Sequence, residues 1–144
     1  MLKEKELTLY TLEQKEVIKL DFIEGGVSAG FPSPCQDYME NSIDLNKELI
    51  DHPASTFCAR VSGNSMIDEG IEDGDILVVD RSLTPRDGRI VVSFIDGEFT
   101  LKKLRLEGNE VWLQPANVNY PAIHITSENN FKIWGVVTYI IKKR

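Results

Sequence analysis

The sequence has few of the residues from which metal centres and disulfide frameworks are built. Its 144 residues include 2 cysteines, Cys35 and Cys58, and 2 histidines, His52 and His124. The cysteines form no CxxC pair, so we expect both to remain reduced thiols. Two isolated histidines are too few for a convincing metal site. The sequence therefore predicts no metal and no other cofactor.

Long apolar runs and an excess of positive charge are also absent. No segment is apolar over the length that crosses a bilayer, and the N-terminal MLKEKELTLY is charged, unlike a signal peptide. We therefore expect a cytoplasmic protein with no membrane partner. The 16 basic and 23 acidic residues give a net charge of −7. Because extended phosphate contact needs a basic surface, we expect no direct sequence-specific DNA binding.

What the sequence does contain, from Ser55 onward, is strong β-strand signal. Turn pairs such as Asp96-Gly97 separate short segments that are rich in β-branched and aromatic residues. The seven segments are STFCARV, DILVVD, RIVVSFI, GEFTLKKLRL, EVWLQP, AIHIT and FKIWGVVTYII. With 42% hydrophobic residues, the chain can build one core. This pattern predicts a mainly all-β domain, either a sandwich or a rolled sheet.

The residues before Ser55 carry weaker signals. Residues 1–24 mix charged and apolar side chains, with a weakly helical stretch around Leu12–Leu20. We expect an arm whose order depends on what it docks against. The stretch GGVSAGFPSP, residues 25–34, follows and has the composition of a linker. Asp44 is the expected N-cap of one short helix, in a segment that ends at Pro53.

One turn, SGNSM at residues 62–66, carries candidate chemistry. Gly63 lets the backbone turn tightly after a strand, and Ser65 then stands where its hydroxyl can be exposed. Most isolated serines in such positions are ordinary turn residues. As a nucleophile, Ser65 would need a base. Neither His52 nor His124 has a sequence context that favours a Ser-His-Asp triad.

A neutral lysine is the alternative base, and GEFTLKKLRL offers Lys102 and Lys103. The ordinary pKa of lysine is about 10.4, so burial must lower it by roughly three units for work near neutrality. Strand alternation places Lys102 with Thr100 and Leu104 on one face, and Lys103 with Arg105 on the other. Thr100 can orient the amine of Lys102, and Leu104 can help to desolvate it. We expect Lys103 to extend into solvent. Without the serine motif, Lys102 would be interpreted as an ordinary strand lysine.

Together these motifs resemble the LexA/UmuD group of self-cleaving serine–lysine peptidases. The matching stretches are SGNSMIDEGIEDGDILVVD, residues 62–80, and DGEFTLKKL, residues 96–104, within a resemblance that runs from about Gly25 to Tyr139. The resemblance implies a rolled β sheet like that of LexA and signal peptidases, with at most one or two short helices. It implies Ser65 as nucleophile and Lys102 as general base. The backbone N–H groups of Asn64 and Ser65 would form the oxyanion hole.

The resemblance also implies a substrate inside the chain. The group cleaves between a small residue and a glycine, and the match here is Ala29-Gly30 within GGVSAGFPSP. Cleavage would remove an arm, residues 1–29, and leave a β-rich domain, residues 30–144. The arm is too short for the DNA-binding domain of a repressor plus a linker. The chain therefore resembles the short-armed, mutagenesis-type members of the group.

Those members imply partners. The resemblance implies a homodimer, a RecA–single-stranded DNA filament that stimulates cleavage, and a Y-family DNA polymerase catalytic subunit. The cleaved fragment would be the accessory subunit in error-prone translesion synthesis during the SOS response. Two alternatives stay open: a signal-peptidase-like serine–lysine hydrolase, which normally needs a membrane anchor, and a catalytically silent β-rich docking module of the same fold.

Overall fold

The computed structural model describes residues 5–13 and 42–144. The strands are β1 (Leu7–Thr11), β2 (Thr56–Val61), β3 (Ile76–Asp80), β4 (Ile90–Ile95), β5 (Glu98–Glu107), β6 (Glu110–Gln114), β7 (Ile123–Ile125) and β8 (Phe131–Ile141). The described helical segments are α2 (Leu45–Leu49) and two 3-10 turns, η1 (Pro53–Ser55) and η2 (Ile67–Glu69). The prediction of a mainly all-β fold is confirmed.

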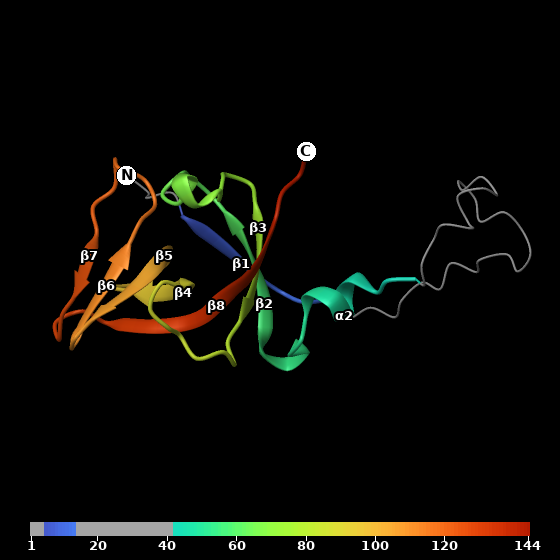
Figure 1. Cartoon of the computed structure of the whole chain (residues 1–144), viewed down its shortest axis with the longest axis horizontal. Coiled ribbons are helices and arrows are strands. Elements are labelled where there is room, and N and C mark those ends of the chain that lie inside the picture. Colours follow the sequence, from blue (N-terminus) through green and yellow to red (C-terminus); the bar gives the residue numbers. More distant parts are fainter. Residues whose placement is uncertain (1–4, 14–41) are drawn as a thin grey trace, which may run out of the picture.

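All of these strands belong to one antiparallel sheet, in the order β1-β2-β3-β8-β4-β5-β6-β7. The last strand, β8, is 11 residues long and pairs with β3 along one part and with β4 along another. In Figure 1 it runs as a long red strand between the two halves of the sheet. The register shifts at Val78/Val79 and at Val92/Ser93 are irregularities of the kind that bend a sheet.

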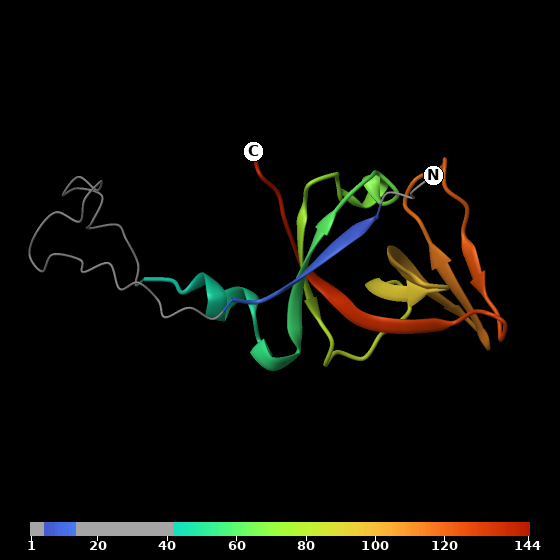
Figure 2. The same ribbon diagram turned by 180° about the vertical axis from the view of Figure 1, so that it is seen from behind.

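The sheet curls, so that its first strand returns to a strand of the other half. β1 contacts β5, although four strands separate the two in the sheet order. Figure 2 shows β1 from behind, crossing the molecule beside β2. The fold is therefore a half-barrel in which the N-terminal strand faces the lysine-bearing strand.

Two apolar clusters hold the curled sheet together. The larger one brings buried residues of the β1, β2 and β3 half into contact with Val92 of β4 and Leu101 of β5. It includes Met66 and Ile71, which flank η2 directly after the serine turn. The smaller cluster is centred on Val91, Leu104, Leu113 and Val136. Because Met66 is buried in the larger cluster, the turn before η2 is anchored to the core.

The strands expected from Ser55 onward are all present, and Asp44 caps α2 as expected. Its Oδ1 accepts hydrogen bonds from the backbone N–H groups of Asn46 at 3.0 Å and Lys47 at 3.4 Å. Within the arm, residues 7–11 dock on β2 as a strand of the sheet, a strand that the sequence did not predict. The stretch GGVSAGFPSP and most of the expected helix around Leu12–Leu20 lie outside the described residues.

No helix among the described residues combines the length and the apolar character needed to cross a bilayer.

Candidate active site

Ser65 lies in the turn between β2 and η2, and it is buried, with 7% of its surface exposed. Gly63 has a φ of +89°, a conformation that side-chain-bearing residues rarely adopt. The N–H of Gly63 donates to Asp73 Oδ1 at 2.8 Å, which fixes the start of the turn. The next residue after the serine, Met66, is buried in the core. The turn is thus fixed on both sides of Ser65.

A second loop braces the same turn. The N–H of Ala116 donates to the Ser65 carbonyl at 2.9 Å, and Asn117 Nδ2 donates to the Asn64 carbonyl at 2.8 Å. The peptide group joining Asn64 to Ser65 is planar and trans. The Ser65 N–H therefore points away from the Asn64 carbonyl. Because Asn117 holds that carbonyl by a hydrogen bond, the same hydrogen bond fixes the direction of the Ser65 N–H. This N–H belongs to the pair expected to form the oxyanion hole.

The structure brings Lys102 of β5 to Ser65. Lys102 Nζ lies 3.3 Å from Ser65 Oγ, 2.9 Å from Thr100 Oγ1 and 3.0 Å from the Leu101 carbonyl oxygen. The side chain of Lys102 is 7% exposed. The three side chains singled out from the sequence, those of Ser65, Thr100 and Lys102, therefore share one buried site. Lys103 is half-buried and forms an ion pair with Glu69, so the expectation that it extends into solvent was wrong.

A fourth side chain, which the sequence did not indicate, occupies this site. Glu6 Oε1 accepts from Ser65 Oγ at 2.5 Å and from Lys102 Nζ at 2.8 Å, and Glu6 Oε2 accepts from Thr100 Oγ1 at 2.7 Å. The backbone carbonyl of Glu6 also accepts from the N–H of Ser62 at 2.7 Å. Glu6 precedes β1, which pairs with β2 from Leu7 opposite Val61. Strand pairing thus delivers the carboxylate to the serine turn.

The signal that could have indicated Glu6 is weak. Leu7 and Leu9 alternate with polar residues, as in a half-buried strand, but the alternation is short and surrounded by charges. This short segment forms a strand because it pairs with the edge of β2 that would otherwise be free. The partners of the Glu6 carboxylate lie 59 to 96 residues away along the chain, beyond the reach of local pattern.

Both histidines are engaged away from Ser65. His52 Nδ1 lies 2.6 Å from Asp80 Oδ2, and Ser55 Oγ donates to Asp80 Oδ1 at 3.2 Å. His124 of β7 stacks on Trp112 of β6, with ring centroids 4.3 Å apart. These contacts agree with the sequence interpretation, which found no context for a Ser-His-Asp triad.

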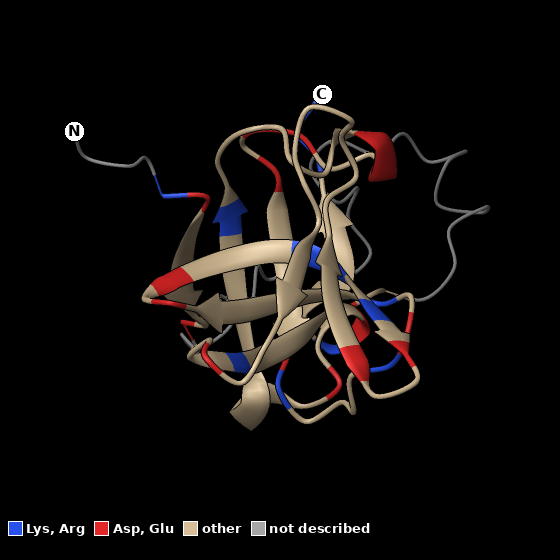
Figure 3. Ribbon diagram, turned by 90° about the vertical axis from the view of Figure 1, so that its left-hand side faces the viewer, with Lys and Arg blue, Asp and Glu red and all other residues tan. Residues whose placement is uncertain are grey.

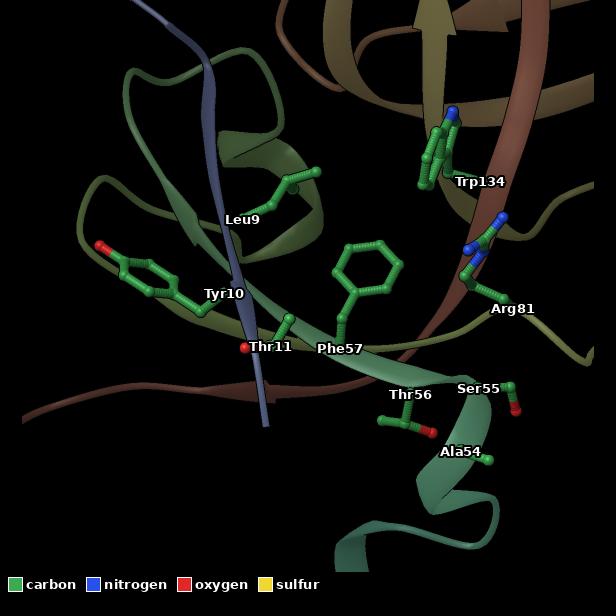
Figure 4. A pocket seen from close by; sticks show the side chains of 9 residues that line it. All are labelled: Leu9, Tyr10, Thr11, Ala54, Ser55, Thr56, Phe57, Arg81 and Trp134. Atoms are coloured by element: carbon green, nitrogen blue, oxygen red, sulfur yellow. The ribbon is translucent and has the colours of Figure 1, made fainter. Parts of the chain in front are cut away.

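An open pocket of about 330 Å³ lies beside the C-terminal end of β1. Figure 4 shows β1 and β2 on one side of it and the side chains of Arg81 and Trp134 on the other. The Arg81 guanidinium carbon lies 4.3 Å from the centre of the Trp134 ring, within the range of a cation–π contact. Leu9 of β1 lines the pocket and also packs against the larger core cluster. β1 therefore lines this pocket with its last residues, and Glu6, just before the strand, lies in the Ser65–Lys102 site.

Comparison with known proteins agrees with this geometry. Residues 21–138 match the family described as Peptidase S24-like. The chain is 48% identical over 114 residues to Protein MucA of Salmonella typhimurium, covering 78% of this chain and 77% of MucA. It is 46% identical over 115 residues to Protein ImpA of Salmonella typhimurium, covering 80% and 78%. The LexA repressor of Acidithiobacillus ferrooxidans is 37% identical over 121 residues, covering 82% of this chain and 58% of the repressor.

The curled β fold and these matches define a class: the chain belongs to the Peptidase S24-like family. Within it, the relatives MucA and ImpA make the chain a UmuD-type member of the LexA/UmuD group of self-cleaving serine peptidases, and the UmuD-type members belong to SOS mutagenesis. The expected cleavage bond, Ala29-Gly30, lies outside the described residues. Cys35 does so too, whereas Cys58 is a free thiol whose pKa is raised by burial.

Proposed function

We propose that the chain cleaves its own Ala29-Gly30 bond with Ser65 as nucleophile and Lys102 as general base. The observation that carries the proposal is the 3.3 Å approach of Lys102 Nζ to Ser65 Oγ in a site where both side chains are buried. This distance is close to hydrogen-bond reach, which a nucleophile and its base need. Lys102 is held there by Thr100, which serves as a positioning residue.

In the proposed reaction, neutral Lys102 removes the hydroxyl proton of Ser65, and Ser65 Oγ forms a bond to the carbonyl carbon of Ala29. The resulting oxyanion is stabilised by the N–H groups of Asn64 and Ser65. When the C–N bond breaks, the proton on Lys102 passes to the amine of Gly30. Lys102 then takes a proton from water as the water oxygen bonds to the carbonyl carbon of Ala29, and it passes this proton to Ser65 Oγ when the ester C–O bond breaks.

The proposed cleavage divides the chain into an arm, residues 1–29, and a β-rich domain, residues 30–144. We further propose that the protein is a cytoplasmic homodimer whose cleavage is stimulated by a RecA–single-stranded DNA filament. The fragment would then serve as the accessory subunit of a Y-family DNA polymerase catalytic subunit in translesion synthesis. Support for this role comes from the UmuD-type relatives, and each partner is open to a separate binding measurement.

The test is incubation of purified protein at alkaline pH and, separately, at neutral pH with RecA, an ATP analogue and single-stranded DNA. We expect a fragment beginning at Gly30, identified by N-terminal sequencing or intact mass. We expect alkaline pH to promote cleavage, because a general base acts only in its deprotonated form. Ser65→Ala and Lys102→Ala should each abolish the fragment while circular dichroism stays that of a folded β protein.

Three results would count against the proposal. Undiminished cleavage in Lys102→Ala would remove the lysine from the mechanism. An unchanged rate in Ala29→Trp, whose bulk should keep the carbonyl from Ser65, would place the bond elsewhere. A wild-type chain that yields no fragment under either condition would favour the catalytically silent docking module.

A further inference from the structure

The carboxylate of Glu6 stands where the carbonyl of a substrate would have to come. Its Oε1 lies 2.5 Å from Ser65 Oγ, so no acyl group can approach that oxygen from the same side. Ser65 donates its only hydroxyl proton to Glu6 and not to Lys102, the group that has to receive it in the proposed reaction. The serine is thus held in an orientation that does not lead to attack.

The lysine is engaged in the same way. Lys102 Nζ lies within hydrogen-bond distance of four acceptors: Glu6 Oε1 at 2.8 Å, Thr100 Oγ1 at 2.9 Å, the Leu101 carbonyl at 3.0 Å and Ser65 Oγ at 3.3 Å. An ammonium group has three N–H donors and no lone pair to accept a proton, so the three shorter contacts use all of its donors. A base has to accept a proton, so this arrangement is the resting form of the pair. Glu6 is the member of the network whose charge favours it.

β1 holds Glu6 in place through two further contacts. The strand pairs with β2 from Leu7 opposite Val61 to Thr11 opposite Phe57. Leu7 is 4% exposed and belongs to the larger core cluster. The backbone ladder, the buried leucine and the carboxylate therefore fix one segment across the edge of β2 and the mouth of the site.

We propose that Glu6 and β1 form an internal inhibitor of the Ser65–Lys102 pair. The edge of β2 and the three side chains Ser65, Thr100 and Lys102 together make a binding site for an extended peptide that carries a side-chain carboxylate just before its first paired residue. The chain fills this site with its own residues 6–11 and must vacate it before a scissile bond can enter. This inference rests on the proposed self-cleavage and adds to it a segment that inhibits the reaction until it leaves the site.

The inhibition is a competition between two segments of one chain for one site. The population of the closed state, in which Glu6 and β1 fill the site, is set by how much more favourable their contacts are in that state than in the open one. Removing the charge of Glu6 weakens the inhibitor without altering either group of the pair. A loss of about 1.4 kcal/mol in that competition corresponds to a tenfold change in the population of the open site.

The test compares the full-length chain with its Glu6→Gln and Glu6→Ala variants at neutral pH, with and without the RecA filament. We expect both variants to release the Gly30 fragment about tenfold faster than the wild type. Glu128→Gln, which neutralises an exposed carboxylate in the turn before β8, is the matched control and should cleave at the wild-type rate.

Hydrogen exchange followed by mass spectrometry gives a readout that needs no cleavage. In the Ser65→Ala background, Glu6→Ala should speed amide exchange in residues 5–13 and in β2. Wild-type cleavage together with an unchanged or slower rate in both Glu6 variants would overturn the inhibitor and leave the proposed function intact. If no variant cleaves, the proposed function fails, and unchanged exchange in residues 5–13 would then overturn the inhibitor as well.

Discussion

At the scale of single residues, Asp80 shows how this fold uses a buried carboxylate. It ends β3, is 4% exposed, and accepts hydrogen bonds from His52, Ser55 and Ser82. Burial alone would raise its pKa, but the hydrogen bonds from Ser82, His52 and Ser55 outweigh burial and hold the pKa of Asp80 below its ordinary value. The charged carboxylate of Asp80 therefore links η1 and the residue before it to the end of β3 and to Ser82.

The lowered pKa of Asp80 predicts a loss of stability in acid. A carboxyl group whose pKa is lower in the folded state stabilises the fold above the unfolded pKa, about 3.9, and this contribution is lost as pH falls through the folded value. Asp80→Asn should lower the free energy of unfolding by about 1–3 kcal/mol at neutral pH. In acid the substitution should lower the free energy of unfolding by less, because the wild type has already lost the contribution of the charged Asp80 there.

Urea denaturation at pH 7 and near pH 3 measures both effects. Asp51→Asn removes an exposed carboxylate from the residue next to His52, and should change stability by no more than about 0.5 kcal/mol. An Asp80→Asn variant as stable as the wild type at pH 7 would show that the hydrogen bonds contribute nothing net.

Single residues were also where the sequence was most informative about the site. Ser65, Thr100 and Lys102 could be expected together because a serine turn and a lysine strand have local signatures and match a known pattern. Glu6 could not, because nothing in KEKELTLY shows which edge a short strand will join. The wrong placement of Lys103 has a similar cause: strand alternation gives its face, but Glu69 reaches that face from a distant turn.

At the scale of elements, β8 depends on one glycine. A Cβ atom at Gly135 would lie 2.6 Å from Val79 Cγ1 and 3.1 Å from the Asp80 carbonyl oxygen. Gly135 pairs with Val92 of β4, beside the register shift in that strand pair. The close approach of β8 to β3 therefore needs the absence of a side chain at this position.

Gly135→Ala should destabilise the fold by about 1–3 kcal/mol, because the added methyl group overpacks the buried contact with the Val79 side chain and the Asp80 backbone. Thermal or urea denaturation measures the loss. Gly108→Asn is the comparison, since its site is open and asparagine tolerates the positive φ of 58°, so a change within about 0.5 kcal/mol is expected. Equal stability of Gly135→Ala and wild type would mean that β3 moves aside at no cost.

The elements from Ser55 onward could be predicted because their alternation and turn pairs act locally. Asp44 could be predicted as a cap for the same reason. β1 could not, since an isolated five-residue strand has little stability of its own and exists here through its ladder to β2 and the burial of Leu7. The order of strands, with β8 between β3 and β4, is likewise a property of the assembled sheet.

At the scale of the whole molecule, the charge distribution bears on partners. The net charge is −7, and Figure 3 shows Lys and Arg positions scattered among Asp and Glu over the sheet. Nonspecific binding to nucleic acid comes almost entirely from neutralised phosphates, which requires a gathered basic surface.

We therefore expect the purified chain to bind a labelled single-stranded oligonucleotide more weakly than about 10⁻⁴ M, even at 50 mM salt. Fluorescence anisotropy measures this directly. When RecA and an ATP analogue are added to the same oligonucleotide, the chain should bind to the filament that forms on it. Micromolar affinity for the bare oligonucleotide, with a steep dependence on salt, would contradict the expectation and point to a phosphate-contacting surface.

The attachment of β1 has a consequence for how the molecule responds to dilution. In the intact chain β1 is tethered to β2, so its effective concentration at that edge is set by the linking segment and is independent of how much protein is present. After cleavage at Ala29-Gly30, only the ladder, Leu7 and Glu6 would retain it. The arm would then leave as the protein is diluted, and the N–H and C=O groups of β2 would become an open edge. Cleavage would thus make the capping of one sheet edge depend on concentration.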